Sequence, residues 1–210
     1  LLFSSFTFYI YLKGNATLAV ILLLGFLVRL SFAILQNYYQ IVPYVWDEKA
    51  FHGVSISYLK YLTGEAALPS VYNSYSSLSS YGTFLGTLYF LFGQDPIIGR
   101  LVSVILGSLV VLSVYKISII IGLSRNVSYL LSAIVAFTPS YIIFSGLIMR
   151  DMLIWLLLNI YIYISIKFFI TNNINDLLTS LAVTLPLILL RKQYAALFAI
   201  YIIILFIFYV

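Results

Sequence analysis

The stretch ATLAVILLLGFLVRLSFAILQ, residues 16–36, contains one charged side chain, Arg29. A helix needs about 20 mostly apolar residues to cross the hydrocarbon core of a bilayer, and this stretch is long enough. Similar apolar stretches follow at 97–121, 127–147, 152–169, 177–190 and 194–210, of which 177–190 is short and contains Pro186. The sequence therefore predicts an all-α, polytopic transmembrane helical bundle with about six spans.

The composition excludes a soluble globular protein. The chain has 210 residues, of which 63% are hydrophobic and only 8% charged, whereas about a quarter of the residues of a globular domain are charged. There are no cysteines, which excludes disulfides and thiolate metal sites. The net charge of +5 is scattered, so we attribute it to membrane topology and phosphate contacts and expect no nucleic-acid partner.

We treat residues 1–210 as a single transmembrane domain. A polar segment at about 37–96 is predicted to be a long extracytoplasmic loop that carries interfacial helices. Within it, 47–62 suits a short surface helix. Residues 77–92 are amphipathic, with Leu78, Tyr81, Leu85, Leu88 and Phe92 on one face, which favours a helix lying flat in the interface. A slightly short span is the alternative.

The position of 77–92 decides the topology. If this helix lies flat, one group of basic residues falls on one side, taken as cytoplasmic: Lys13, Lys116, Arg125 and Lys167. The other charged residues then share the opposite side: Asp47, Glu48, Arg150, Asp151 and Arg191. If it spans, Arg150 and Asp151 move away from Asp47.

Ionisable groups near a membrane are costly and often mark function. Asp47-Glu48 is either a pair of acids in the first turn of a helix, where the dipole favours them, or a carboxylate base at the membrane surface. Arg150-Asp151 is either a helix terminus or a second acidic or phosphate-binding element.

Arg191-Lys192 anchors a helix at the interface or clamps a phosphate. Arg29 requires an anionic or backbone partner, or a route along which its side chain can reach the interface. The only histidine, His52, is interpreted as a structural hydrogen-bonding residue.

Several short motifs occur in a characteristic order. They are Leu27-Val-Arg29, Trp46-Asp47-Glu48 with Phe51, Leu91-Phe92-Gly93, Gly99-Arg100-Leu101 with Ser103, Thr138-Pro139, and Arg150-Asp151. Over about 18–198, this order resembles the GT-C superfamily of glycosyltransferases, in particular the polyprenyl-phosphate-sugar-dependent protein O-mannosyltransferase and aminoarabinose transferase types. The chain departs from the family at Phe51, where Tyr is frequent, and at 72–75, which lacks a basic residue.

The resemblance implies transfer of a sugar from a polyprenyl-phosphate-linked donor to a glycan, lipid or protein acceptor at the extracytoplasmic face. It implies catalytic roles for Asp47, Glu48 and Asp151, and phosphate or donor binding by Arg150, Arg191, Lys192 and Arg100. It also implies a flat helix at 77–92 and a longer chain with a further C-terminal part.

If the three carboxylates converge, their oxygen atoms suit a hard divalent cation, and no other cofactor is indicated. We expect a multi-pass protein of the plasma membrane, or of the ER membrane in a eukaryote. The alternatives are a polysaccharide polymerase or ligase, a membrane transporter, and a scaffold without catalysis.

Overall fold

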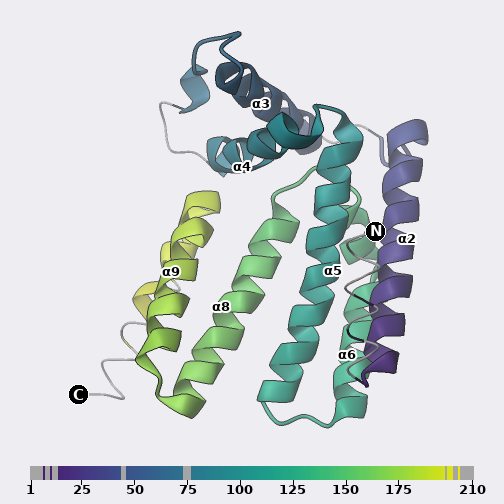
Figure 1. Cartoon of the computed structure of the whole chain (residues 1–210), viewed down its shortest axis with the longest axis vertical. Helices are drawn as coiled ribbons and strands as arrows, with labels where there is room; N and C mark the ends of the chain where they lie inside the picture. The colour runs from purple at the N-terminus through teal and green to yellow at the C-terminus, as the bar shows by residue number, and fades with distance from the viewer. Residues whose placement is uncertain are drawn as a thin grey trace.

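The computed structural model describes Thr7, Ile10 and residues 14–43, 46–72, 77–196, 198–200 and 203. Its regular elements are helices, and most of them run side by side as a bundle (Figure 1). Among the described residues, three helices are long and apolar enough to cross a membrane: α2 (Ala16–Tyr39), α5 (Pro96–Ile120) and α8 (Asp151–Thr171). The expected all-α membrane bundle is thereby confirmed.

The remaining predicted spans take different forms. The stretch predicted at 127–147 is a pair of helices, α6 (Arg125–Phe137) and α7 (Pro139–Ser145), with a bend of 58° between them. The pair adds a fourth candidate span only if the two helices are counted together as one span. Helix α9 (Ile174–Leu190) is a shorter apolar helix that continues through Pro186. After it, a 3₁₀ turn (Lys192–Tyr194) interrupts the chain. Most of the span predicted at 194–210 lies outside the described residues.

The start of α5 is fixed by local chemistry. Asp95 precedes the helix and its carboxylate accepts a hydrogen bond from the N–H of Ile97 at 2.9 Å. Pro96 occupies the first helical position, where its missing N–H is not needed and its φ already suits a helix. Arg100 is therefore placed in the second turn of α5, close to this end of the bundle.

The bend between α6 and α7 corrects the expectation of one continuous span. The residue before a proline avoids the helical region, and Thr138 is extended, with φ −63° and ψ 123°. Because Pro139 has no N–H, the carbonyl of Val135 loses its helical partner. Arg29 supplies the missing donors, from Nη2 to Val135 O at 3.1 Å and from Nη1 to Ala136 O at 2.8 Å. The partner that Arg29 requires is therefore backbone.

Helices α3 (Trp46–Leu62) and α4 (Ser77–Phe92) lie together across one end of the bundle, not alongside α5 and α8 (Figure 1). This arrangement agrees with the flat interpretation of 77–92. On the predicted apolar face of α4, Phe92 at the end of the helix is 67% exposed, but Tyr81 and Leu85 are buried, as is Tyr89, each at most 1% exposed. The three buried side chains pack in one cluster with Phe51 of α3 and with residues of α8 and α9.

The arrangement separates the charged residues into two groups. Glu48, Arg100 and Asp151 lie at the end covered by α3 and α4 (Figure 1). Lys116, Arg125 and Lys167 lie near the opposite end, where α5 meets α6 and α8 meets α9. This is the grouping that a flat 77–92 predicts, although Lys13 falls outside the described residues.

Candidate active site

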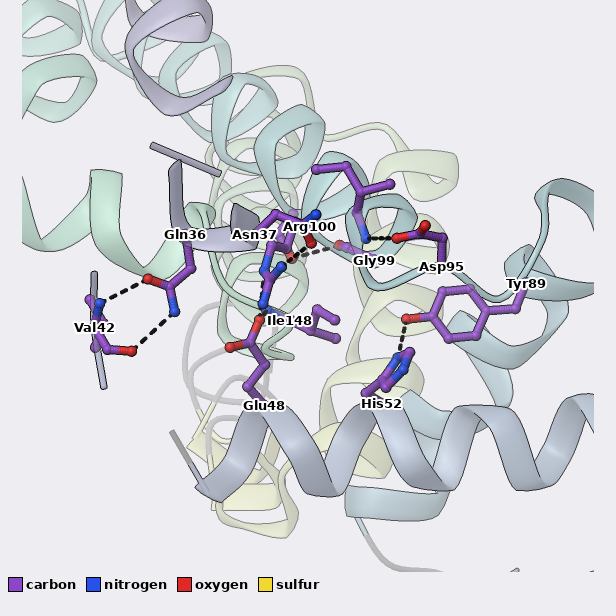
Figure 2. Close-up of polar contacts among 12 residues, drawn as sticks. Gln36, Asn37, Val42, Glu48, His52, Tyr89, Asp95, Gly99, Arg100 and Ile148 are labelled. Atoms are coloured by element: carbon purple, nitrogen blue, oxygen red, sulfur yellow. Dashed lines mark hydrogen bonds and ion pairs between the residues drawn. The ribbon is translucent and has the colours of Figure 1, made fainter. Parts of the chain in front are cut away.

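Glu48 connects three parts of the fold. Its side chain is about 10% exposed, and Oε1 lies 2.9 Å from Nε of Arg100. The same oxygen accepts a hydrogen bond from the backbone N–H of Ile148 at 3.1 Å. Figure 2 shows Glu48 pointing from α3 toward α5 and the loop before α8. A charge-assisted bond and a backbone donor thus hold this carboxylate in one position.

Arg100 is held from two sides. Its Nη1 donates a hydrogen bond to the side-chain oxygen of Asn37, near the end of α2. Gly99 allows this close packing, because a Cβ at that position would lie 2.7 Å from the Tyr89 hydroxyl and 3.0 Å from the Ile148 side chain. The Gly99-Arg100 pair therefore joins α2, α3, α4 and α5 at one point.

His52 lies one helical turn after Glu48, and its Nδ1 is hydrogen-bonded with the Tyr89 hydroxyl at 2.8 Å (Figure 2). Burial lowers the pKa of His52 below its usual 6.5, and the charge of Arg100 lowers it further. Burial also raises the pKa of Tyr89. Both groups are consequently uncharged near pH 7.

A pocket of about 380 Å³ opens beside this cluster, and we call it the Glu48 pocket. Its walls come from the end of α2 and the following turn, from α3 and α5, and from the loop before α8: Gln36, Gln40, Val42, Pro43, Glu48, Lys49, His52, Pro96, Arg100 and Ile148. One carboxylate and two cations line it, so an anionic ligand is favoured over a cationic one.

Asp47 is exposed, next to the buried Glu48. Within the part of the chain that the structure describes, its carboxylate forms no hydrogen bond or ion pair. It does not line the Glu48 pocket. The neighbouring acids therefore differ, with one carboxylate fixed by partners and the other accessible to solvent.

Arg150 and Asp151 lie at the same end of the bundle but outside the Glu48 pocket. The Arg150 guanidinium sits over the ring of Phe51, 5.5 Å from its centroid. Asp151 begins α8 and is close enough to the buried Tyr81 to help raise the pKa of that hydroxyl, after the larger effect of burial. Arg150 therefore contacts α3 through an aromatic ring, and Asp151 acts electrostatically on a tyrosine of α4.

Arg191 and Lys192 are exposed at the end of α9, which packs against α4. Neither residue lines the Glu48 pocket. Across the described residues, no three His, Asp or Glu side chains are grouped in a way that could hold a metal ion.

Sequence reasoning missed four contributors to the site. Asn37, Lys49, His52 and the Ile148 N–H all border the pocket or its ion pair. His52 had a local signal, because it stands four residues after Glu48 and so lies on the same helix face. Asn37 and Ile148 had none, since they meet Arg100 and Glu48 only through the tertiary fold.

Comparison with known families shows a match over most of the chain. The family described as dolichyl-phosphate-mannose-protein mannosyltransferase matches residues 23–210, which is most of the chain. This confirms the resemblance carried by the motifs between Arg29 and Arg150. No curated protein and no solved structure matches the chain.

Proposed function

Because the chain belongs to the dolichyl-phosphate-mannose-protein mannosyltransferase family, and so to the membrane glycosyltransferases, we propose that it transfers a sugar from a polyprenyl-phosphate-linked donor to an acceptor at the extracytoplasmic face. The observation that carries the proposal is the Glu48–Arg100 pair, held by Asn37 and Ile148 in the wall of a pocket at one end of the bundle.

The chemistry requires a base and a group that stabilises a leaving phosphate. An acceptor hydroxyl attacks the anomeric carbon of the sugar, and the bond between that carbon and the phosphate oxygen breaks. The hydroxyl proton passes to a carboxylate, and the polyprenyl phosphate departs as an anion. Positive charge near the phosphate lowers the barrier, because negative charge develops there in the transition state.

The two neighbouring acids divide these roles. Oε1 of Glu48 accepts from both Arg100 and the Ile148 N–H, so we assign Glu48 to positioning the site. Asp47 is exposed and adjacent, so we assign it as the general base that accepts the proton of the acceptor. Asp151 begins α8 at the same end, and we assign it to orienting the acceptor.

The cations divide into an inner and an outer group. Arg100 and Lys49 line the pocket, so they are suited to the phosphate of the bound donor. Arg150 lies over Phe51, and Arg191 and Lys192 are exposed at the end of α9. We assign these three to the approach of the anionic headgroup along the covered end of the bundle.

A transfer assay on the full-length protein, with a radiolabelled polyprenyl-phosphate sugar, tests the proposal. Asp47→Asn should lower the transfer rate at least about a hundredfold, which is the lower range for loss of a general base, and should leave donor binding intact. Asp176→Asn is the matched control, because that carboxylate pairs with Lys167 at the opposite end. Transfer by Asp47→Asn at the control's rate would refute the assignment of Asp47.

A further inference from the structure

The end of the bundle opposite the Glu48 pocket contains a second candidate binding site. A pocket of about 410 Å³ lies beside the turn between α5 and α6, and Lys116, Arg125, Tyr115 and Asn15 contribute to its walls. Lys116 follows Arg100 by 16 positions in the same helix, or about 24 Å at 1.5 Å per residue. The two sites are therefore at different membrane faces of the bundle.

This pocket adjoins an apolar cavity. A cavity of about 220 Å³ between α5 and α8 is lined mainly by aliphatic side chains, among them Leu109, Leu112, Leu156 and Ile160. Lys116 and Tyr163 line both spaces. Leu109 and Leu112 precede Lys116 by one to two helical turns, so the apolar part lies about 6–10 Å deeper along α5. We call the combined space the basic groove.

Among the described residues, no acid compensates the charge in the basic groove. Lys116 and Arg125 are both exposed, and among the residues that the structure describes neither has a carboxylate within 4 Å. Lys167, one turn beyond Tyr163 on α8, differs because it pairs with Asp176 at 2.8 Å. Two cations are thus left at the mouth of an apolar cavity.

We propose that the basic groove binds an anionic phospholipid of the leaflet at the α5–α6 end. The phosphate lies against Lys116 and Arg125, and one acyl chain lies in the cavity between α5 and α8. Charge complementarity selects the anionic headgroup, and the depth of the apolar part selects a lipid over a free phosphate. This site is separate from the proposed transfer reaction and does not depend on it.

Native mass spectrometry of the full-length protein in detergent, titrated with phosphatidylglycerol or with phosphatidylcholine of the same chains, tests the proposal. Each basic residue near an anionic surface strengthens the binding of an anionic headgroup. The double variant Lys116→Gln/Arg125→Gln should therefore weaken phosphatidylglycerol binding about 30-fold. Lys167→Gln is the matched control and should bind as the wild type does. Lys116→Arg keeps the charge and should also retain binding, which separates lost charge from lost folding.

The apolar part is tested separately. Leu156→Trp fills the cavity between α5 and α8 and should weaken phosphatidylglycerol binding, whereas 10 mM inorganic phosphate should not displace the lipid from the wild type. The proposal would be overturned if the wild type bound both lipids equally, or if the double variant bound phosphatidylglycerol as tightly as the wild type. It would also be overturned if phosphate displaced the lipid and Leu156→Trp had no effect. The last result would indicate a site for free phosphate.

Discussion

Oε1 of Glu48 lies 2.9 Å from Nε of Arg100, and both side chains are about 10% exposed. The two residues are 52 positions apart, and their contact joins the helix that covers the end of the bundle to a helix within it. A pair at this depth stays favourable only when other partners satisfy the remaining atoms. Asn37 accepts from Nη1 of Arg100, and the Ile148 N–H donates to the same Oε1 of Glu48.

The stability losses from removing the two members of this pair should not add. Glu48→Met or Arg100→Met leaves a largely buried charge uncompensated, which typically costs about 3–5 kcal/mol. The double replacement removes both charges and should lose less stability than the sum of the single losses. Thermal unfolding in detergent measures this, with Asp47→Asn as the exposed control. Additive losses would show that the pair is not coupled.

His52 should make the covered end of the bundle sensitive to acid. Its pKa in the folded protein is lowered from 6.5, first by burial, so its contribution to stability is present above pH 6.5 and is lost as the pH falls below that value. The unfolding midpoint should therefore decrease between pH 7.5 and pH 5.5. His52→Asn places an amide near the position of Nδ1 and should reduce this decrease.

Tyr89→Phe provides the comparison for the His52 variant. It removes the hydroxyl that bonds with His52 but keeps the ring and the charge environment. It should lower stability at both pH values by about 1 kcal/mol, the usual contribution of one hydrogen bond. If His52→Asn shows the full acid sensitivity of the wild type, another group is responsible.

Arg29 and Pro139 should interact energetically. Arg29→Met leaves the carbonyls of Val135 and Ala136 without donors, and each unsatisfied buried group costs about 1–3 kcal/mol. Pro139→Ala restores a backbone N–H that can serve Val135 if α6 continues. The double variant should thus be more stable than the two single losses predict. Unfolding midpoints of the four proteins form the test, and strict additivity would contradict it.

The contact between α3 and α4 should depend on Gly86. A Cβ at this position would lie 2.7 Å from the backbone oxygen of Ser55 and 3.0 Å from the ring of Tyr58. Backbone cannot move aside cheaply, so Gly86→Ala should separate the helices, lower the unfolding midpoint and reduce sugar transfer.

Gly53 offers the control for Gly86 on the same helix pair. A Cβ at Gly53 meets nothing within 4 Å, and Ala is the better helix former by roughly 1 kcal/mol. Gly53→Ala should therefore be neutral or stabilising. Equal effects of the two replacements would show that helix propensity, and not close packing, decides both outcomes.

Features with a local signal were predictable from the sequence. The apolar length of 16–36 predicts α2, and the spacing of Tyr81 and Leu85 predicts that these two residues share the buried face of α4. Asp47-Glu48 stands out in the sequence because acids are rare in this chain. The assignment of separate roles to these two acids was not predictable, since it depends on Arg100 and Ile148 reaching only one of them.

Other features lacked a local signal or had one that was outweighed. Thr138-Pro139 was present within the apolar stretch 127–147, but uniform hydropathy favoured one straight span. The partner of Arg29 could not be identified, because any backbone carbonyl is a suitable acceptor and only the fold selects Val135 and Ala136. His52 looks structural in isolation, and its place in the pocket wall depends on the tertiary fold, in which the Glu48–Arg100 pair joins α3 to α5.

The contact between Arg29 and Ala136 also bears on the order of synthesis. The two residues are 107 positions apart, so α2 leaves the ribosome long before α6 exists. During that interval the guanidinium has none of its α6 acceptors, and a charge at the centre of a helix strongly disfavours entry into lipid. We therefore expect α2 to remain beside the insertion machinery, or to sit shallowly, until α6 arrives. On this expectation, α2 settles in the bilayer together with α6 and not on its own.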